Sequence, residues 1–157
     1  MTETERLLKV LRQGAVDRPP VTSMMVSVTT DLMDGAGVKL PDAHHDPELM
    51  VRLAGSAYEI TGVESVKLPF DLTVEAEAMG AKIDFGTMLA LPQVKEHPYE
   101  APKAIPHAND FLFKARVPVI LEAIQLAKKR YEELSKDPEA SLWLIEGNTI
   151  LKRWGGK

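Results

Sequence analysis

The chain has 157 residues, a formal net charge of −4 and no cysteine, with 45% apolar and 27% charged residues. Its length and composition are typical of one soluble globular domain, so we expect a single domain over residues 1–157. The acidic balance argues against nucleic-acid binding, which uses basic patches, and the absence of cysteine excludes disulfides and thiolate metal ligands within the chain. No apolar run reaches the ~18 residues of a membrane span. The polar N-terminus does not resemble a secretory signal, so we expect a cytoplasmic protein without membrane contact.

The first predicted helix begins at a capping box, in which Thr2 is the N-cap and Glu5 reaches back toward it. Apolar residues then recur at helical spacing, and Gly14 ends the pattern. Two prolines exclude a continuing helix. The stretch 21–28 is rich in β-branched and apolar residues, which predicts the first buried strand.

Thr29, Thr30 and Asp31 follow this strand directly. Side chains at the carboxyl end of a buried parallel strand are candidates for ligand contact. The same residue types also suit the N-cap of a short helix from Leu32 to Gly35, which is their commoner use. Both interpretations stay open.

A second helix is predicted between Asp46 and Gly62. Asp46 is a good N-cap, Pro47 suits the first helical position, and the apolar residues that follow lie on one face. His44 and His45 are adjacent, so they do not form the i, i+4 pair of a helical metal site. We interpret them as polar loop residues.

Residues 64–69 form the next predicted strand, and strand, helix and strand in succession are typical of a parallel βαβ unit. Asp71 lies just beyond the carboxyl end of this strand, where ligands gather in α/β folds. It is therefore a candidate catalytic residue. The alternative is that its side chain caps the following turn.

A short helix is predicted from Val74 to Met79, with Gly80 as its end. If the turn after Asp71 is helical, Glu75 shares its face by the i, i+4 rule, and Glu77 points elsewhere. The alternative is that both glutamates lie on an exposed helix surface.

Four further segments complete the pattern. Residues 81–85 alternate and predict a short strand, whereas residues 86–114 contain several prolines and predict a long irregular stretch. Residues 117–134 form an amphipathic helix, and residues 141–146 predict a further buried strand. These strands alone do not complete a closed barrel, which needs eight of them.

Several segments, in this order and spacing, resemble the uroporphyrinogen decarboxylase superfamily. They are Thr4–Gly14, Val16–Val21, Asp31–Met33, Pro41–His44, Asp46–Met50, Leu68–Gly80, His97–Tyr99 and Pro118–Ile124. The nearest resemblance is to the branch of methylcobamide:coenzyme M methyltransferases, and it runs from about residue 3 to about residue 134.

The resemblance implies an α/β fold, the N-terminal part of a (β/α)8 TIM barrel that is incomplete in this chain. In this branch a zinc ion activates the thiol of coenzyme M, which accepts a methyl group from a corrinoid carried by a separate small protein. The family's zinc ligands lie in the second half of the barrel, so we expect no metal ligand here. A corrinoid protein is the implied partner, together with a second half-barrel chain or a homodimer.

Two alternatives accompany this interpretation. In the decarboxylase branch an aspartate that aligns with Asp71 binds the pyrrole nitrogens of the substrate. That branch also has an arginine-rich motif for substrate carboxylates, and residues 25–30 contain no arginine, which disfavours tetrapyrrole decarboxylation. The other alternative is a non-catalytic half-barrel that serves as a subunit or binding module. The predicted site comprises Asp71 as catalytic residue and Thr29, Thr30 and Glu75 as substrate-binding residues.

Overall fold

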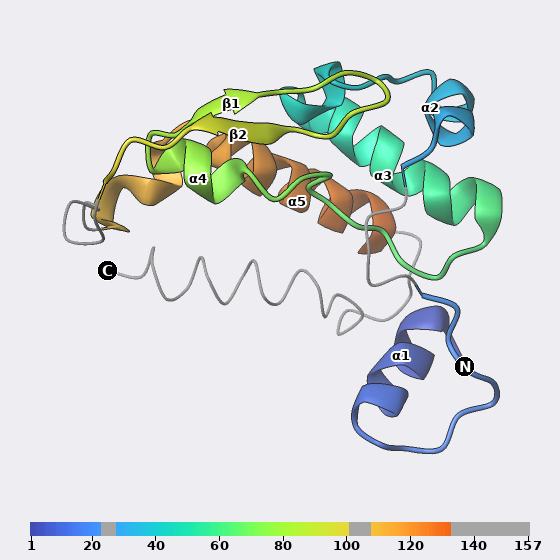
Figure 1. Cartoon of the computed structure of the whole chain (residues 1–157). Coiled ribbons are helices and arrows are strands. Elements are labelled where there is room, and N and C mark those ends of the chain that lie inside the picture. Colours follow the sequence, from blue (N-terminus) through green and yellow to red (C-terminus); the bar gives the residue numbers. More distant parts are fainter. Residues whose placement is uncertain (23–27, 101–107, 133–157) are drawn as a thin grey trace.

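The computed structural model describes residues 1–22, 28–100 and 108–132 (Figure 1). Its elements are α1 (Glu3–Leu11), α2 (Thr30–Ala36), η1 (Asp42–His44), α3 (Pro47–Thr61), α4 (Val74–Ala78), β1 (Lys82–Asp84), β2 (Gln93–Glu96), η3 (Ala108–Phe113) and α5 (Val117–Glu132). The predicted strand at 141–146 lies outside the described residues, as does most of the one at 21–28. Within those three ranges, no helix is long and apolar enough to cross a membrane.

Helix α3 lies at the centre of the hydrophobic core. The Asp46 side chain accepts a hydrogen bond from the Leu49 amide at 2.9 Å, and Gly62 ends the helix with φ +73°, as the sequence predicts. Both α2 and α5 pack against α3 (Figure 1). Met50 and Leu53 of α3 are fully buried in this core. Burial of the apolar face is what holds the three helices together.

Strands β1 and β2 form an antiparallel hairpin, and this hairpin is the two-stranded sheet seen in the described residues. Cross-strand ion pairs join Lys82 to Glu96 and Lys95 to Asp84, each at 3.0 Å. Strand β2 and helix η3 lie within the stretch 86–114, so the prediction that this stretch is irregular is wrong. The exposed β2 lacks the apolar alternation that marks a half-buried strand.

The prediction of a strand at residues 64–69 is not fulfilled in the described part of the chain, where this segment belongs to no hydrogen-bonded ladder. The start of the segment contacts residues 21 and 22. The Glu64 amide donates to the Val21 carbonyl at 2.6 Å, and the hydroxyls of Thr22 and Ser65 lie 3.0 Å apart. A strand requires a paired neighbour, and the expected neighbour runs into residues that the structure does not describe.

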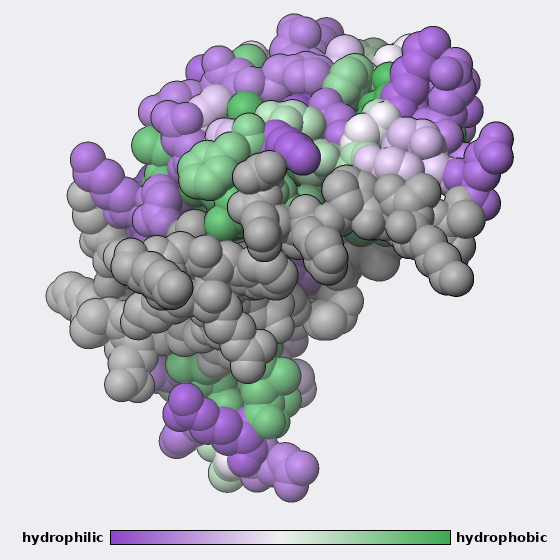
Figure 2. All heavy atoms as spheres, turned by 90° about the vertical axis from the view of Figure 1, so that its left-hand side faces the viewer, coloured by the Kyte–Doolittle hydropathy of each residue, from purple (hydrophilic) through white to green (hydrophobic). Residues whose placement is uncertain are grey.

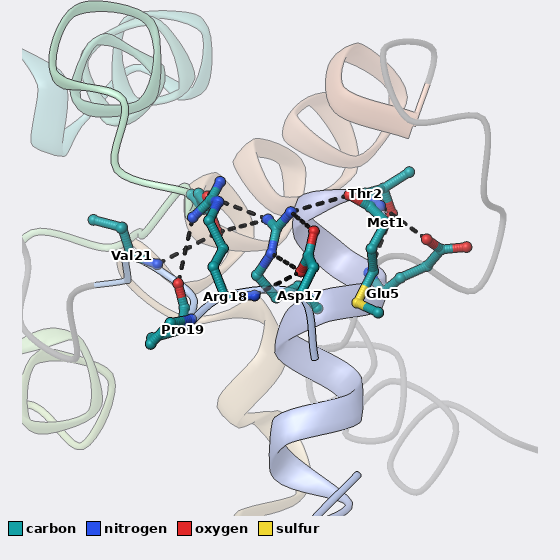
Figure 3. A network of polar contacts seen from close by, with 9 residues as sticks. Met1, Thr2, Glu5, Asp17, Arg18, Pro19 and Val21 are labelled. Atoms are coloured by element: carbon teal, nitrogen blue, oxygen red, sulfur yellow. Dashed lines mark hydrogen bonds and ion pairs between the residues drawn. The ribbon is translucent and has the colours of Figure 1, made fainter. Parts of the chain in front are cut away.

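A network of charged side chains ties α1 to the start of this segment (Figure 3). Arg6 is buried and donates to both carboxylate oxygens of Asp17, at 2.8 and 3.0 Å. Its Nη1 also lies 3.2 Å from Oε2 of Glu64, which pairs with Arg18 as well. The hydrogen bond from Arg6 holds the pKa of Asp17 well below its usual range.

This network fixes the start of the segment that leads to Asp71. Glu64 is held by Arg6 and by the Val21 carbonyl, and Asp71 lies seven residues after Glu64.

Candidate functional site

Asp71 lies at the end of the extended segment 64–70, and its side chain is only 1% exposed. Its Oδ1 accepts hydrogen bonds from the Thr73 amide at 2.8 Å and from the Thr73 hydroxyl at 2.5 Å. This geometry confirms the interpretation that Asp71 caps the following turn. The same carboxylate also meets Arg116, whose Nη1 lies 3.0 Å from Oδ2.

Arg116 immediately precedes α5 and is itself buried. Its Nε donates to Oε2 of Glu77 at 2.6 Å, so the planar guanidinium bridges Asp71 and Glu77. The expectation that Glu77 points away from Asp71 is therefore wrong. Helix α4 begins only at Val74, after a turn, so helical spacing counted from Asp71 does not apply. Glu75 is exposed instead.

The charges of this cluster are strongly stabilised. Burial alone would raise the pKa of the Asp71 carboxyl, but His44 and Arg116 hold it well below its usual range. Burial would lower the pKa of the Arg116 guanidinium, whereas Asp71 and Glu77 raise it above its ordinary value. A carboxylate with such a low pKa is a weak proton acceptor near neutral pH. Asp71 is thus suited to positioning and electrostatic stabilisation.

Two histidines and an aromatic ring enclose the ion pair. His44 is fully buried, so it is not the polar loop residue that we predicted, and its Nδ1 lies 3.3 Å from Oδ2 of Asp71. The His45 ring meets the Phe85 ring edge-on at 4.4 Å, and Arg116 lies over the same Phe85 ring at 4.8 Å. Burial, together with the charge of Arg116, lowers the pKa of His45.

A cavity of about 280 Å³ lies next to this cluster in the chain. Phe70, the neighbour of Asp71, contributes to its wall. The side chains of its lining are apolar except for two hydroxyls. The lining comprises Val28, Thr29, Thr30, Met33, Leu40, Phe70, Met88, Leu89, Ala90 and Leu91. Val28 and Phe70, which are far apart in the sequence, therefore line the same cavity.

Thr29 and Thr30 both line this cavity, and Thr29 is also the N-cap of α2. The Thr29 hydroxyl accepts a hydrogen bond from the Leu32 amide at 3.3 Å. Capping and cavity lining, which the sequence presented as alternatives, coincide at this residue. Asp71 and Glu75 do not line the cavity.

Replacing Thr29 with Ala is expected to lower the free energy of unfolding by about 1 kcal/mol, because an orphan amide of α2 loses its acceptor. Urea denaturation measures the change. Thr30→Ala is the matched control, since Thr30 lines the same cavity without capping the helix, and we expect a change of less than about 0.5 kcal/mol. Equal losses in the two variants would show that the cap contributes nothing.

Sequence patterns identified Asp71 but not its partners. Arg116, Glu77 and His44 lie in separate elements, and no local spacing connects them. Their only signal is chemical, because a buried carboxylate requires a cation or several donors nearby. Arg116, which directly precedes an amphipathic helix, was the candidate for this cation.

The described residues do not provide a zinc site. No group of at least three histidine, aspartate, glutamate or cysteine side chains there is placed to hold a metal ion. The whole sequence also lacks cysteine. The carboxylates of the cluster, Asp71 and Glu77, both accept hydrogen bonds from Arg116. This donor set does not fit the thiol-activating zinc that the family resemblance implies.

Two large apolar side chains next to the cluster in sequence are exposed, namely Leu72 and Phe113. Figure 2 views the side of the molecule that lies to the left in Figure 1, and hydrophobic residues lie there among hydrophilic ones. Exposed apolar groups of this kind are typical of contact surfaces.

Comparisons with known proteins agree with this architecture. The methylcobamide:CoM methyltransferase MtaA of Methanosarcina barkeri is 42% identical over 128 residues, which cover 80% of this chain and 37% of that protein. The methylcobamide:CoM methyltransferase MtbA of Methanosarcina acetivorans is 35% identical over 131 residues, 83% of this chain and 39% of that protein. The chain thus spans little more than a third of these relatives.

A solved structure of a methyltransferase from Methanosarcina mazei superimposes with a TM-score of 0.79 at 40% identity, covering 83% of this chain and 39% of that one. Residues 2–136 match the uroporphyrinogen decarboxylase (URO-D) family. These matches imply a TIM-barrel-like fold. The resemblance found in the sequence is confirmed, and the chain belongs to the uroporphyrinogen decarboxylase family.

Proposed function

We propose that this chain takes part in corrinoid-dependent methyl transfer, from a methylcobamide to a thiol such as coenzyme M. The observation that carries the proposal is the 42% identity with a methylcobamide:CoM methyltransferase over 80% of the chain. The cavity lined by Val28 and Phe70 agrees with it, since most of its side chains are apolar and a methyl group and a thioether are apolar ligands.

In the proposed reaction the thiolate sulfur forms a bond to the methyl carbon while the cobalt–carbon bond breaks, and the bonding electron pair remains on cobalt. Phe70 and Met33 give the cavity an apolar wall, which favours attack by a poorly solvated thiolate. The hydroxyls of Thr29 and Thr30 orient the acceptor by hydrogen bonds. Asp71 acts indirectly. Its bond to Arg116 fixes the backbone next to Phe70, and Phe70 lines the cavity. A substrate contact by the exposed Glu75 stays a prediction.

Thiol activation is assigned to residues outside those described, since their donor set does not fit zinc. We propose that residues 1–157 form one domain, the N-terminal part of a TIM barrel, and that the remainder of the barrel comes from further polypeptide. The exposed Leu72 and Phe113 are candidates for that contact. The corrinoid protein is the second proposed partner.

A complementation assay tests this function. The purified chain is mixed with a polypeptide carrying the part of the Methanosarcina barkeri relative that this chain does not match, together with methylcobalamin, coenzyme M and zinc. Formation of methylated thiol, followed by mass spectrometry, is expected only when both polypeptides are present. Asp71→Asn is expected to reduce the rate. A lower rate in Glu75→Ala would indicate a substrate contact by Glu75, and an unchanged rate would indicate an inert surface position. Absence of transfer with both polypeptides correctly folded would contradict the proposal.

A non-catalytic subunit that binds a corrinoid protein is the second candidate. The exposed Leu72 and Phe113, which are available for contact with another polypeptide, agree with it. This candidate predicts that the chain binds a corrinoid protein without any methyl transfer in the complementation assay. Light scattering of the purified chain tests the associated proposal of a homodimer.

A further inference from the structure

The turn between β1 and β2 has an unusual composition. Thr87 and Ala90 exchange two backbone hydrogen bonds, at 2.9 and 3.3 Å, which leaves Met88 and Leu89 at the tip of a tight turn. Tight hairpin turns favour Gly, Asn and Asp at these positions. Here the tip is apolar, and the Leu89 side chain is 80% exposed. Because so little of it is buried, this side chain contributes little to the stability of the fold and is available for contact.

The hairpin holds this turn firmly in place. Gly86 has φ +71°, and a Cβ atom at this position would lie 2.0 Å from the Ala90 carbonyl oxygen, so only glycine fits. Phe85 is held from behind by Arg116 at 4.8 Å. The tip is therefore a preorganised surface, and a preorganised surface binds with a smaller loss of conformational entropy than a flexible loop.

The same turn forms part of the cavity wall, since Met88 and Leu89 both line it. The proposed methyl donor is too large for this space, because a cavity of about 280 Å³ admits a small ligand but not a corrin macrocycle. For its methyl group to reach the cavity, the macrocycle must lie across the mouth. Whatever side chains border the mouth then contact its face.

We propose that the Met88–Leu91 turn is the surface on which the corrin face of a methylcobamide docks. This inference rests on the proposed function and adds the contact that positions the methyl donor. The corrin ring is a broad face edged with methyl and methylene groups, so it buries the Leu89 side chain and closes the mouth against water. Leu91, which is also exposed, extends the same apolar surface.

Calorimetric titration of the 157-residue chain with methylcobalamin tests the proposal. We expect Leu89→Asp to weaken binding by about tenfold or more, because it replaces a buried apolar contact with a charge. Leu11→Asp is the matched control, since Leu11 is 58% exposed on α1 and does not line the cavity. It is expected to bind as the unchanged chain does. Circular dichroism verifies that both variants fold, and Leu89→Ser repeats the test without adding a charge.

Equal affinity of the Leu89 and Leu11 variants for methylcobalamin would overturn the inference. So would a Leu89→Asp variant that loses affinity for a corrinoid protein but keeps its affinity for free methylcobalamin, because the turn would then contact protein rather than corrin. The complementation assay separates this failure from that of the proposed function. Methyl transfer at an unchanged kcat/KM in Leu89→Asp refutes only the docking surface, whereas no transfer by the unchanged chain refutes the function itself.

Discussion

Replacing Arg116 with Met is expected to lower the free energy of unfolding by about 3–5 kcal/mol. The guanidinium is 4% exposed and compensates two carboxylates, those of Asp71 and Glu77. Removing it leaves the buried charge of Asp71 without its main partner, and this penalty exceeds the small gain from a wholly apolar side chain. Since small domains are stable by only about 5–15 kcal/mol, the variant should approach the limit of folding.

Urea denaturation followed by circular dichroism measures this change. Arg130→Met is the matched control, because Arg130 also pairs with a glutamate, Glu59, but both side chains are nearly half exposed. Exposed ion pairs contribute about 0–1 kcal/mol, so the control should lose little. Arg116→Lys retains the charge without the planar fork and should be intermediate. Losses of similar size for Arg116→Met and Arg130→Met would show that the buried cluster is not a principal source of stability.

Replacing Asp71 with Asn is expected to cost about 2–3 kcal/mol near neutral pH, somewhat less than the loss of Arg116. Arg116 keeps Glu77 as a partner in this variant, and the Asn side chain still accepts a hydrogen bond from Thr73. What disappears is the negative charge, which the folded protein stabilises more than the unfolded chain does.

The loss caused by Asp71→Asn should depend on pH in a defined direction. The pKa of Asp71 is lowered in the folded protein, so its stabilising contribution is complete above the unfolded pKa of about 3.9 and declines as the pH falls toward the folded pKa. The difference in unfolding free energy between the unchanged chain and Asp71→Asn should therefore be constant above about pH 5 and narrow below about pH 4. Denaturation curves at several pH values measure it. Glu75→Gln, at an exposed position, serves as the control, and a difference that widens in acid would contradict the assignment.

The helices were the predictable part of this fold, because their signals are local. Thr2 and Glu5 form the predicted capping box, and Asp46 and Gly62 bound α3 as expected. In each case the residues that determine the helix end lie within one turn of it, so their spacing in sequence reflects their spacing in the structure.

The candidate site was predictable only in part, because its partners are distant in sequence. Asp71 was found from its position after an apolar segment, but Arg116 lies 45 residues later and joins it only through tertiary packing. The strand predicted at residues 81–85 is confirmed as β1, but its partner β2 was missed for a related reason. Strand β2 is exposed throughout and is joined to β1 by ion pairs such as Lys82–Glu96, so it has no hydrophobic period to detect.

The segment from Glu64 to Asp71 is held at both ends. Glu64 is bound to the Arg6 network and to Val21, and Asp71 is bound to Arg116. A deletion of a single residue between these anchors would shorten an extended chain by ~3.3 Å and turn every later side chain to the opposite face. One of the two anchors would then have to break. The number of residues between the two anchors therefore determines the geometry of this segment, so a deletion here should be far more harmful than a substitution.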